Sequence, residues 1–349
     1  MGMDNNQTKN VFPKIINTGN WSQGHIQGIA VDKANGYIYY CFTTILIKAK
    51  FDGTVIGWVK GFIGHLGCID FNEDDGKVYA SLELKHDVIG SYVEKSTGIK
   101  IADENAFYIA IIDVDKINRP DMDAEKDEVV KTTYLPKVVE WYDAVLPDGT
   151  PHKYAVSGID GTGVGPVFGD ENGTKKLMVA CGIYGDNNRE DNDFNIIMQY
   201  DIRAINECAL TPSQLAPHHS GLMPEEVYFL YTGNTDWGIQ NLEYDEYTGN
   251  WLVAVYKGHK EQFRNYPFFI IDGSVKPRTD TVTYGETGKV LTLFNEGIYF
   301  NKGTTGMYSF GDGYYYFSHD YRNEDKTYAS NIRLYRYDEK ETFVLLENK

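Results

Sequence analysis

Short hydrophobic runs alternate with polar turns along the whole chain, and the pattern is clearest between Gly24 and Gly61. Four runs rich in Val, Ile, Tyr and Thr, residues that favour strands, occupy Ile29–Asp32, Tyr37–Phe42, Ile45–Phe51 and Val55–Val59. Asn-Gly ends the turn at residues 32–36 and Asp-Gly ends the turn at 51–53, and both pairs tolerate the backbone angles of tight hairpins. The segment therefore predicts a four-stranded antiparallel unit.

The same order of runs and turns recurs four more times. An Asp closes a hydrophobic run at each of five positions: Asp52, Asp113, Asp201, Asp272 and Asp338. Turns like that at 32–36 recur at residues 72–76, 169–173, 245–249 and 311–313. Because one such unit leaves its faces and edges exposed, five copies predict radial closure into a propeller. A pair of β-sandwiches is the alternative, but it gives no reason for the repeated order of turns.

We therefore predict an all-β fold, a five-bladed β-propeller of four-stranded antiparallel blades, in a single domain over residues 11–349. The predicted blades are residues 24–61, 64–136, 155–233, 235–295 and 303–348. Residues 1–10 are expected to form a flexible tail. Val11–Asn17 is expected to join the last blade as an outer strand and close the ring, and Phe343–Glu347 competes for the same place.

The chain has 349 residues, of which 27 are Tyr and 35 are Gly, and this composition suits many short strands and turns. Its formal net charge of −17 repels phosphates and anionic lipid surfaces, so neither nucleic acid nor a membrane is an expected partner. No apolar run is long enough to span a membrane. The polar start shows no secretory signal. A secreted or periplasmic location and a cytoplasmic one both stay open, as does the oligomeric state.

A glycine-rich stretch occupies residues 157–165, Ser-Gly-Ile-Asp-Gly-Thr-Gly-Val-Gly. Phosphate-binding loops have a similar density of glycine, but here neither a helix pattern nor a P-loop Lys follows. We predict that the stretch is a glycine-rich turn.

Loops that enter the innermost strand of a propeller blade and loops that leave its second strand emerge on one face, where the mouth of the ring can bind ligands. His25 and His65 each lie seven residues before the first turn of their blades, so both are expected to point to the same mouth. The loops leaving the second strands add His, Tyr and charged residues, whereas the opposite face has mainly Asp, Asn and Gly in turns. This asymmetry is the strongest functional signal in the sequence.

Two acids interrupt the innermost strands. Asp70 lies between Ile and Phe, and Glu243 lies between Leu and Tyr, so alternation points both toward the central axis from blades that are not adjacent. A buried acid needs a partner or stays protonated. The pair is expected either to take part in catalysis or to form a hydrogen-bonded plug in the channel.

Acids and aromatic side chains at one mouth suit glycan chemistry. Two carboxylates about 5–10 Å apart can cleave a glycosidic bond, and sugar rings can stack on Trp21, Trp237, Tyr184 and Tyr256. The architecture resembles that of five-bladed glycosidases of the arabinanase and fructosidase class, although residues 25–30, His-Ile-Gln-Gly-Ile-Ala, stand in place of the acidic motif of their first strand. The strings GHLG at 64–67 and YTGNTDWGIQNLEYD at 231–245 also resemble uncharacterised bacterial propeller proteins.

The leading hypothesis is a carbohydrate-active enzyme, most simply a glycoside hydrolase, whose partner is a small carbohydrate or a polysaccharide. Its predicted catalytic residues are Asp70, Glu243, Asp320, His65 and His319. Its predicted substrate-binding residues are His25, Gln27, Glu83, His86, Asp160, Tyr184, Asp186, Asp236, Trp237, Gln240, Tyr256, Lys257 and Arg322.

Two other functions stay open. A polysaccharide lyase needs a His or Tyr base and a cation beside the uronate carboxylate, and these types are present in His65, His86, Tyr184, Tyr256, Lys257 and Arg322. A non-catalytic glycan-binding propeller would have equivalent sites in every blade, whereas these loops differ between blades. A single divalent cation is a further expectation, either zinc at His25, His65 and His319 or calcium at the axis carboxylates.

Overall fold

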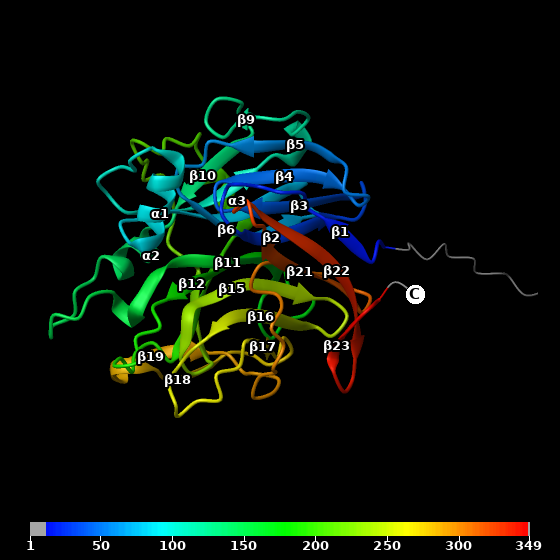
Figure 1. The fold of residues 1–349 in the computed structure, drawn as a ribbon. Helices are drawn as coiled ribbons and strands as arrows, with labels where there is room; N and C mark the ends of the chain where they lie inside the picture. Colours follow the sequence, from blue (N-terminus) through cyan, green and yellow to red (C-terminus); the bar gives the residue numbers. More distant parts are fainter. Residues whose placement is uncertain (1–11, 348–349) are drawn as a thin grey trace, which may run out of the picture.

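The computed structural model describes residues 12–347 and consists of five β-sheets around a central axis (Figure 1). The innermost strands of the sheets are β2, β6, β11, β15 and β20. Each of these strands packs against the innermost strand of the next sheet, and β20 packs against β2, so the ring is closed. The five-bladed β-propeller is thereby confirmed. Residues 1–10, predicted to be a tail, lie outside the described residues.

Blade 1 has the four antiparallel strands that the sequence predicts: β2 (Ile26–Asp32), β3 (Tyr37–Phe42), β4 (Ile45–Lys50) and β5 (Val55–Lys60). The Asp32 carboxylate accepts hydrogen bonds from the backbone and side chain of Asn35, and Gly36 takes a positive φ of 71°, as a tight turn requires. A short strand from the next blade, β9 (Met122–Asp123), pairs with β5 in parallel.

Blade 2 contains β6 (His65–Asn72), β7 (Lys77–Leu84), β8 (Ala106–Ile112) and β10 (Val130–Tyr134). Helix α1 (Val88–Thr97) fills the long insertion between β7 and β8. The Asp87 carboxylate caps this helix by accepting from the backbone N–H groups of Ile89 and Gly90.

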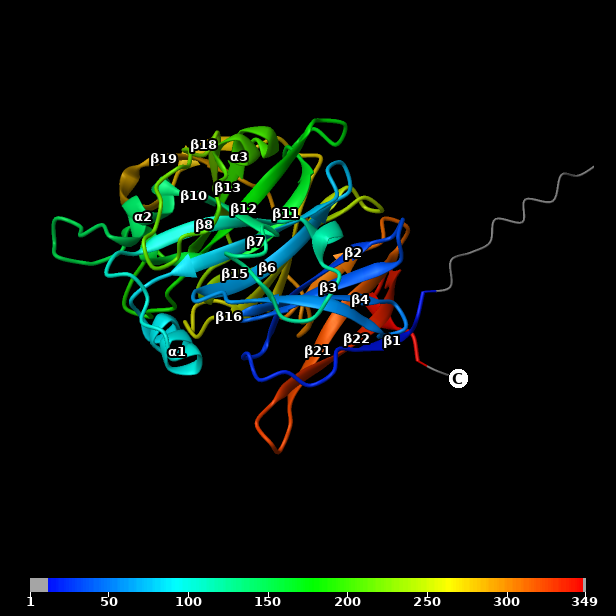
Figure 2. The same cartoon turned by 90° about the horizontal axis from the view of Figure 1, so that it is seen from above.

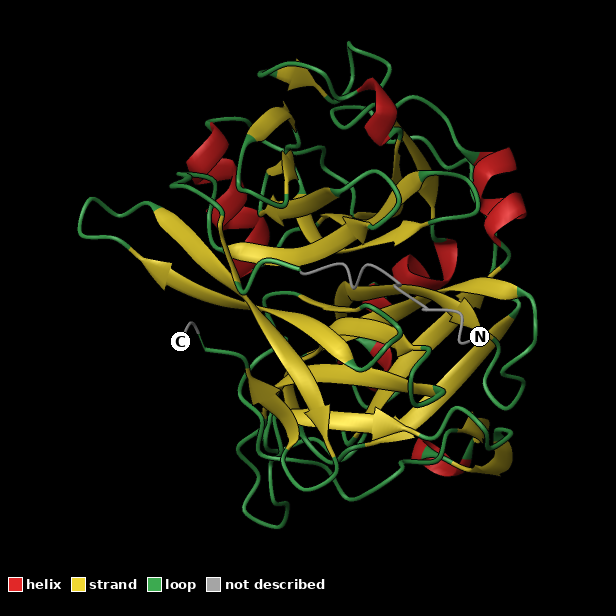
Figure 3. Ribbon diagram, turned by 90° about the vertical axis from the view of Figure 1, so that its right-hand side faces the viewer, coloured by secondary structure: helices red, strands yellow, loops and turns green. Residues whose placement is uncertain are grey.

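Blade 3 contains β11 (Val156–Pro166), β12 (Lys175–Ile183), β13 (Phe194–Tyr200) and β14 (Glu226–Tyr231). Helices α2 (Pro136–Tyr142) and α3 (Ile202–Cys208) lie in the connections before and inside this blade. Single 3-10 turns occupy Val114–Lys116, Lys153–Ala155 and Thr283–Gly285. Figure 3 shows how small the share of helix is beside that of strand.

The prediction of a glycine-rich turn at residues 157–165 is wrong, because these residues form most of strand β11. Glycine is needed there because the strand runs against neighbouring side chains at the axis. A Cβ atom at Gly158 would collide with the Glu83 carboxylate, and one at Gly163 would lie too close to the Trp251 ring. The absence of a side chain therefore permits close packing of the innermost strands.

Blade 4 corrects the prediction of four strands in every blade. It has three: β15 (Thr235–Asp245), β16 (Asn250–Lys257) and β17 (Phe268–Ile271). The following hairpin, β18 (Arg278–Thr281) and β19 (Thr287–Val290), pairs instead with β14 of blade 3. Isolated bridges from Leu293 and Ile298 pair with the edge of β17, so an irregular segment stands where a fourth strand would protect the edge.

Both ends of the described chain meet in blade 5, whose strands are β20 (Met307–Ser309), β21 (Tyr314–Arg322) and β22 (Tyr328–Asp338). The outer edge of β22 is shared by β1 (Ile15–Asn17) at residues 331–333 and by β23 (Thr342–Leu345) at residues 335–338. The N-terminal strand thus closes the ring as predicted, and the two competing segments divide the place between them.

The hydrophobic core lies between adjacent blades. One cluster joins Leu46 and Val59 of blade 1 to Leu82 and Ala110 of blade 2, for example. Further clusters fill the other interfaces around the ring. Within residues 12–347, no helix is long and apolar enough to cross a membrane.

Candidate functional site

The innermost strands place the predicted site residues at two opposite ends of the axis. His65 begins β6, and Asp70 lies five residues further along the same strand, which corresponds to roughly 16 Å at about 3.3 Å per residue. We call the end at which the innermost strands begin and the second strands finish the loop face. The other end, which carries the turns between first and second strands, is the turn face.

A buried group at the loop face is centred on Glu83. Its carboxylate lies 2.9 Å from Lys85 Nζ and 3.1 Å from His65 Nδ1, and it accepts a 2.7 Å hydrogen bond from the Ile159 N–H. Burial alone would raise the pKa of Glu83, but the Lys85 charge and the His65 hydrogen bond lower it. Glu83 is therefore held as an anion.

Lys85 is a residue of this group that the sequence-based prediction missed. Its ammonium also lies 3.4 Å from the Asp87 carboxylate and donates to the Ser157 carbonyl at 2.7 Å. Lys85 directly follows β7 and lies two residues after Glu83, so continued alternation places the two side chains on one face. That spacing was the available signal.

Asp160 differs from Glu83 in its environment. Its Oδ2 accepts a 3.2 Å hydrogen bond from Gln240 Nε2, and its Oδ1 lies 3.8 Å from His65 Nδ1. Burial raises the pKa of Asp160 to about 7, although the nearby His65 charge opposes the shift. Burial alone would lower the pKa of His65, but the hydrogen bond to Glu83 and the Asp160 charge outweigh it and raise that pKa. The loop face thus carries one carboxyl group fixed as an anion and one able to hold a proton near neutral pH.

Three further predicted residues lie around this group. Burial raises the pKa of Tyr256, and the negative charges of the nearby Asp320 and Asp160 raise it further. Burial and the neighbouring His65 charge lower the pKa of His25, against the opposing effect of Asp320. Thr305 donates a 3.3 Å hydrogen bond to the exposed Asp320 carboxylate. Blades 1, 2, 3, 4 and 5 all contribute to one mouth.

An aromatic wall borders the mouth on the side of blades 3 and 4. The rings of Tyr184 and Trp237 lie 5.6 Å apart in an edge-to-face arrangement, and the Tyr184 hydroxyl donates to Asp87 at 3.1 Å. Trp237 is half-buried and adopts a left-handed backbone with φ 65°, a conformation that is uncommon for an aromatic residue and often occurs at binding sites. Gln240 donates to the Trp237 carbonyl.

The remaining loop-face residues are more scattered. Gln27 is buried and contacts His25 Nε2 at 3.3 Å. The structure exposes His86, Asp186 and Lys257, half-buries Asp236, and places Arg322 at the exposed end of β21. Asp186 accepts from the backbone of Asn188, as a turn residue does.

His319 does not join His25 and His65. Its Nε2 forms a 2.8 Å hydrogen bond with the Tyr335 hydroxyl, and Tyr335 belongs to the apolar cluster between blades 4 and 5. Burial, Lys302 and Arg333 lower the pKa of His319 to about 4. Its neighbour Asp320 points to the other face of the sheet and reaches the mouth, because successive strand residues point to opposite faces.

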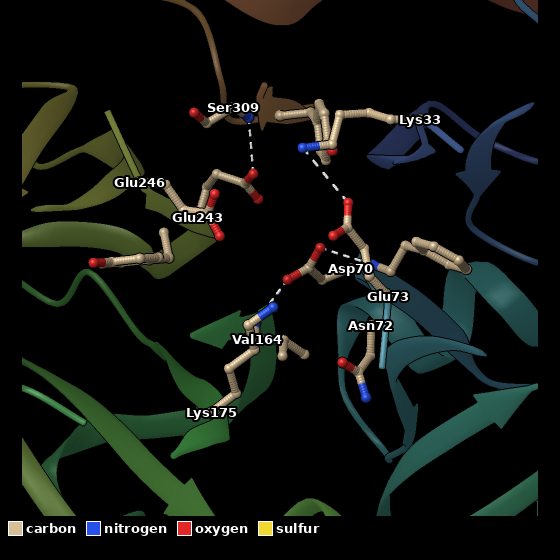
Figure 4. A pocket seen from close by; sticks show the side chains of 12 residues that line it. Lys33, Asp70, Asn72, Glu73, Val164, Lys175, Glu243, Glu246 and Ser309 are labelled. Carbon is tan, nitrogen blue, oxygen red and sulfur yellow. Dashed lines mark hydrogen bonds and ion pairs between the residues drawn. The ribbon is translucent and has the colours of Figure 1, made fainter. Parts of the chain in front are cut away.

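Asp70 and Glu243 meet at the turn face (Figure 4). Asp70 accepts hydrogen bonds from the N–H groups of Phe71 and Val164, and Glu243 accepts one from the N–H of Ser309. Burial raises the pKa of Asp70 to about 7, and burial together with the Asp70 charge raises that of Glu243. Both therefore point toward the axis as predicted, but the structure separates them from the histidines.

The space beside this acid pair is small. The pocket encloses about 60 Å³ between Lys33, Glu73, Lys175 and Glu246, enough for a few water molecules. This volume is well below the roughly 300–1,000 Å³ that is typical of small-molecule sites. The geometry of this end thus favours the hydrogen-bonded plug over a catalytic pair.

The predicted cation gains no support from side-chain geometry. Within residues 12–347, no group of three or more His, Cys, Asp or Glu side chains is arranged to hold a metal ion. The zinc and calcium sites remain predictions from sequence.

No family model and no curated protein matches the chain. Similar solved structures include a GH43 β-1,3-galactosidase with galactodeoxynojirimycin, at 10% identity and TM-score 0.44, covering 96% of this chain and 99% of that one. They also include an exo-1,5-α-L-arabinanase from a bovine ruminal metagenomic library (11%, 0.42, 95% and 99%) and a glucose dehydrogenase (9%, 0.37, 92% and 99%). The resemblance to five-bladed glycosidases is one of architecture, and at these TM-scores it carries no argument about chemistry.

Proposed function

We propose that this propeller is a carbohydrate-active enzyme, a glycoside hydrolase that acts at the mouth of the loop face. The observation that carries the proposal is that two acids of different character, Asp160 and Asp320, both lie near Tyr256 at the loop face. Asp160 is buried with a pKa of about 7, whereas Asp320 is exposed. Pairs of acids in such different environments divide the acid and base roles in glycosidic cleavage.

In the proposed reaction, Asp160 protonates the glycosidic oxygen as the bond to the leaving sugar breaks. Asp320 acts as the nucleophile or as the base that activates water. His65 Nδ1 lies 3.8 Å from one Asp160 oxygen, and Gln240 donates a hydrogen bond to the other. The Tyr184–Trp237 wall provides the apolar surface on which a sugar ring stacks.

This assignment keeps Asp320 and His65 from the sequence-based set and gives Asp160 a role in the chemistry in place of substrate binding. It leaves out Asp70 and Glu243, because they lie at the opposite end of the axis beside a much smaller pocket than ligand sites usually have. It also leaves out His319, because its ring is bonded to Tyr335.

The test is release of reducing ends from a panel of polysaccharides and oligosaccharides. Asp160→Asn and Asp320→Asn are expected to lower turnover by about 10²–10⁴-fold, while both variants unfold at the temperature of the unsubstituted protein. Asp186→Asn is the matched control, because Asp186 is an exposed acid of the same face that serves a turn.

Full activity in both Asn variants would overturn the assignment. Products that absorb in the ultraviolet would identify a polysaccharide lyase in place of a hydrolase. Saturable binding of several glycans per chain without turnover would identify a binding propeller.

A further inference from the structure

Arg322 at the outer rim of the loop face is held by an aromatic ring. Its guanidinium carbon lies 5.3 Å from the centre of the Tyr328 ring. The two residues are direct cross-strand partners at the ends of β21 and β22. An arginine stacked in this way is pre-oriented and keeps its N–H donors free for a ligand.

The Arg322–Tyr328 pair is connected to the mouth by neighbouring rings. The ring centres of Tyr328 and His25 lie 6.4 Å apart. The charges of His65 and Asp320 in turn affect the pKa of His25. Burial raises the pKa of Tyr92 on α1, and the positive charge of Arg322 partly opposes that shift. Figure 2 shows α1 and the tip of the β21–β22 hairpin projecting from the same side of the molecule.

In the part of the chain that the structure describes, Arg322 forms no ion pair with Asp or Glu, a property that it shares with Arg333 and Arg336. Within residues 12–347, ion pairs with Asp or Glu involve the arginines Arg119, Arg189, Arg203, Arg264 and Arg278. Arg322 has an aromatic partner instead. Salt screens charges more than about 8 Å away at physiological ionic strength, so the charge that most opposes an anion there is Asp320 on the same face of β21 and not the net charge of −17.

We propose that Arg322 and Tyr328 form a subsite for an anionic sugar residue, one that carries a carboxylate, as uronic acids do, or a sulfate. The planar guanidinium suits two oxygens of such a group, and the exposed Tyr92 ring is available to pack against the sugar. Asp320 lies two residues before Arg322 on the same face of β21. A residue bound there is therefore next to the proposed catalytic acids, and its role in a reaction rests on the proposed function, whereas its binding does not.

The experiment measures binding without turnover. Calorimetry on an Asp160→Asn background compares oligogalacturonate with neutral galacto-oligosaccharide of equal length, and both with the sulfated form. Anionic probes are expected to bind more tightly than the neutral one, and Arg322→Ala is expected to weaken only the anionic probes, by about tenfold or more. Arg322→Lys should recover part of the loss. Arg336→Ala, an exposed arginine near the other end of β22, is the control and should change nothing.

The arms separate carboxylate from sulfate, and they separate this inference from the proposed function. Loss of anionic binding in Arg322→Ala supports the subsite even if no glycan is cleaved. Equal binding of neutral and anionic probes overturns it, as does unchanged affinity in Arg322→Ala or failure of every anionic probe to bind. Hydrolysis of neutral glycans alone, with Arg322→Ala fully active, would leave the hydrolase standing and remove the subsite.

Discussion

Glu83 Oε2, near the end of β7, lies 2.9 Å from Nζ of Lys85, the residue that directly follows the strand, and both side chains are buried. This ion pair forms the base of the mouth: Glu83 also bonds His65 and the Ile159 N–H of the next blade, and Lys85 bonds the Ser157 carbonyl. The pair thus joins blades 2 and 3 directly beneath the proposed catalytic acid. Removing the ion pair tests how much it contributes to the free energy of unfolding.

Lys85→Met is expected to destabilise the protein by about 3–5 kcal/mol, because it leaves the buried Glu83 charge without its cation. The free energy of unfolding in urea measures the change. Lys100→Met is the matched control: Lys100 pairs with Asp103 in solvent, so its loss should not alter the unfolding curve. Equal stability of Lys85→Met and the unsubstituted protein would show that the pair contributes no net stability.

The acid pair at the turn face predicts an unusual dependence of stability on pH. Burial raises the folded-state pKa of Asp70 from 3.8 to about 7 and raises that of Glu243, so the folded chain binds more protons than the unfolded chain. Stability from this pair is fully present at low pH and is lost as the pH rises through about 7.

Glu243→Gln is therefore expected to stabilise the protein by more than about 1 kcal/mol at high pH, the equivalent of roughly one pKa unit, and to flatten the dependence on pH. The Gln side chain keeps an acceptor for the Ser309 N–H and removes a charge beside Asp70. Asp70→Asn should gain less, since both Asp70 oxygens accept backbone N–H groups. Denaturation across a pH series checks this, with the exposed Glu246→Gln as control.

The same variant tests the alternative role of this end. Glu243→Gln is expected to keep full turnover on any glycan that the protein cleaves. A large loss of turnover with unchanged stability would instead return Glu243 and Asp70 to the catalytic role suggested by the sequence.

The repeated turns were sufficient to predict five blades, ring closure by the N-terminal strand, and a common mouth for His25 and His65. They did not predict that residues 278–290 pair with blade 3, because edge-to-edge pairing between blades leaves no local pattern. The sequence predicted that Asp70 points toward the axis, because alternation along a strand shows which way a side chain points. The prediction did not separate Asp70 from the loop face, although the five-residue distance from His65 indicates that Asp70 lies at the other end of the strand.

The alternation of side chains along a strand explains the other differences between the predicted site and the structure. His319 and Asp320 are adjacent, so they point to opposite faces of β21, and only Asp320 belongs to the mouth. The same alternation places Lys85 beside Glu83, although Lys85 was missing from the residues predicted from sequence. Burial and pairing between distant strands then decide which acid keeps its proton, and no local pattern contains that information.

Closure of the ring by β1 gives a further prediction. Ile16 is 1% exposed and packs in the cluster between blades 1 and 5, whereas Ile15 is 38% exposed. Ile16→Ala is expected to lower the free energy of unfolding by about 2–5 kcal/mol, and Ile15→Ala by less than about 0.5 kcal/mol. Thermal and urea denaturation compare the two. Similar small effects for both would mean that β1 contributes little to ring stability.

The raised pKa of Asp160 predicts how turnover should depend on pH. Burial holds this pKa at about 7, and a general acid must be protonated to act, so kcat/KM is expected to fall as the pH rises above about 7. The positive charge of His65 opposes the rise in the pKa of Asp160. His65→Gln removes that charge, so the fall in kcat/KM should move to higher pH. Asp160→Asn should abolish this fall along with most of the activity. If kcat/KM of the unsubstituted protein stays constant as the pH rises through about 7, Asp160 is not the general acid, and another group must protonate the glycosidic oxygen.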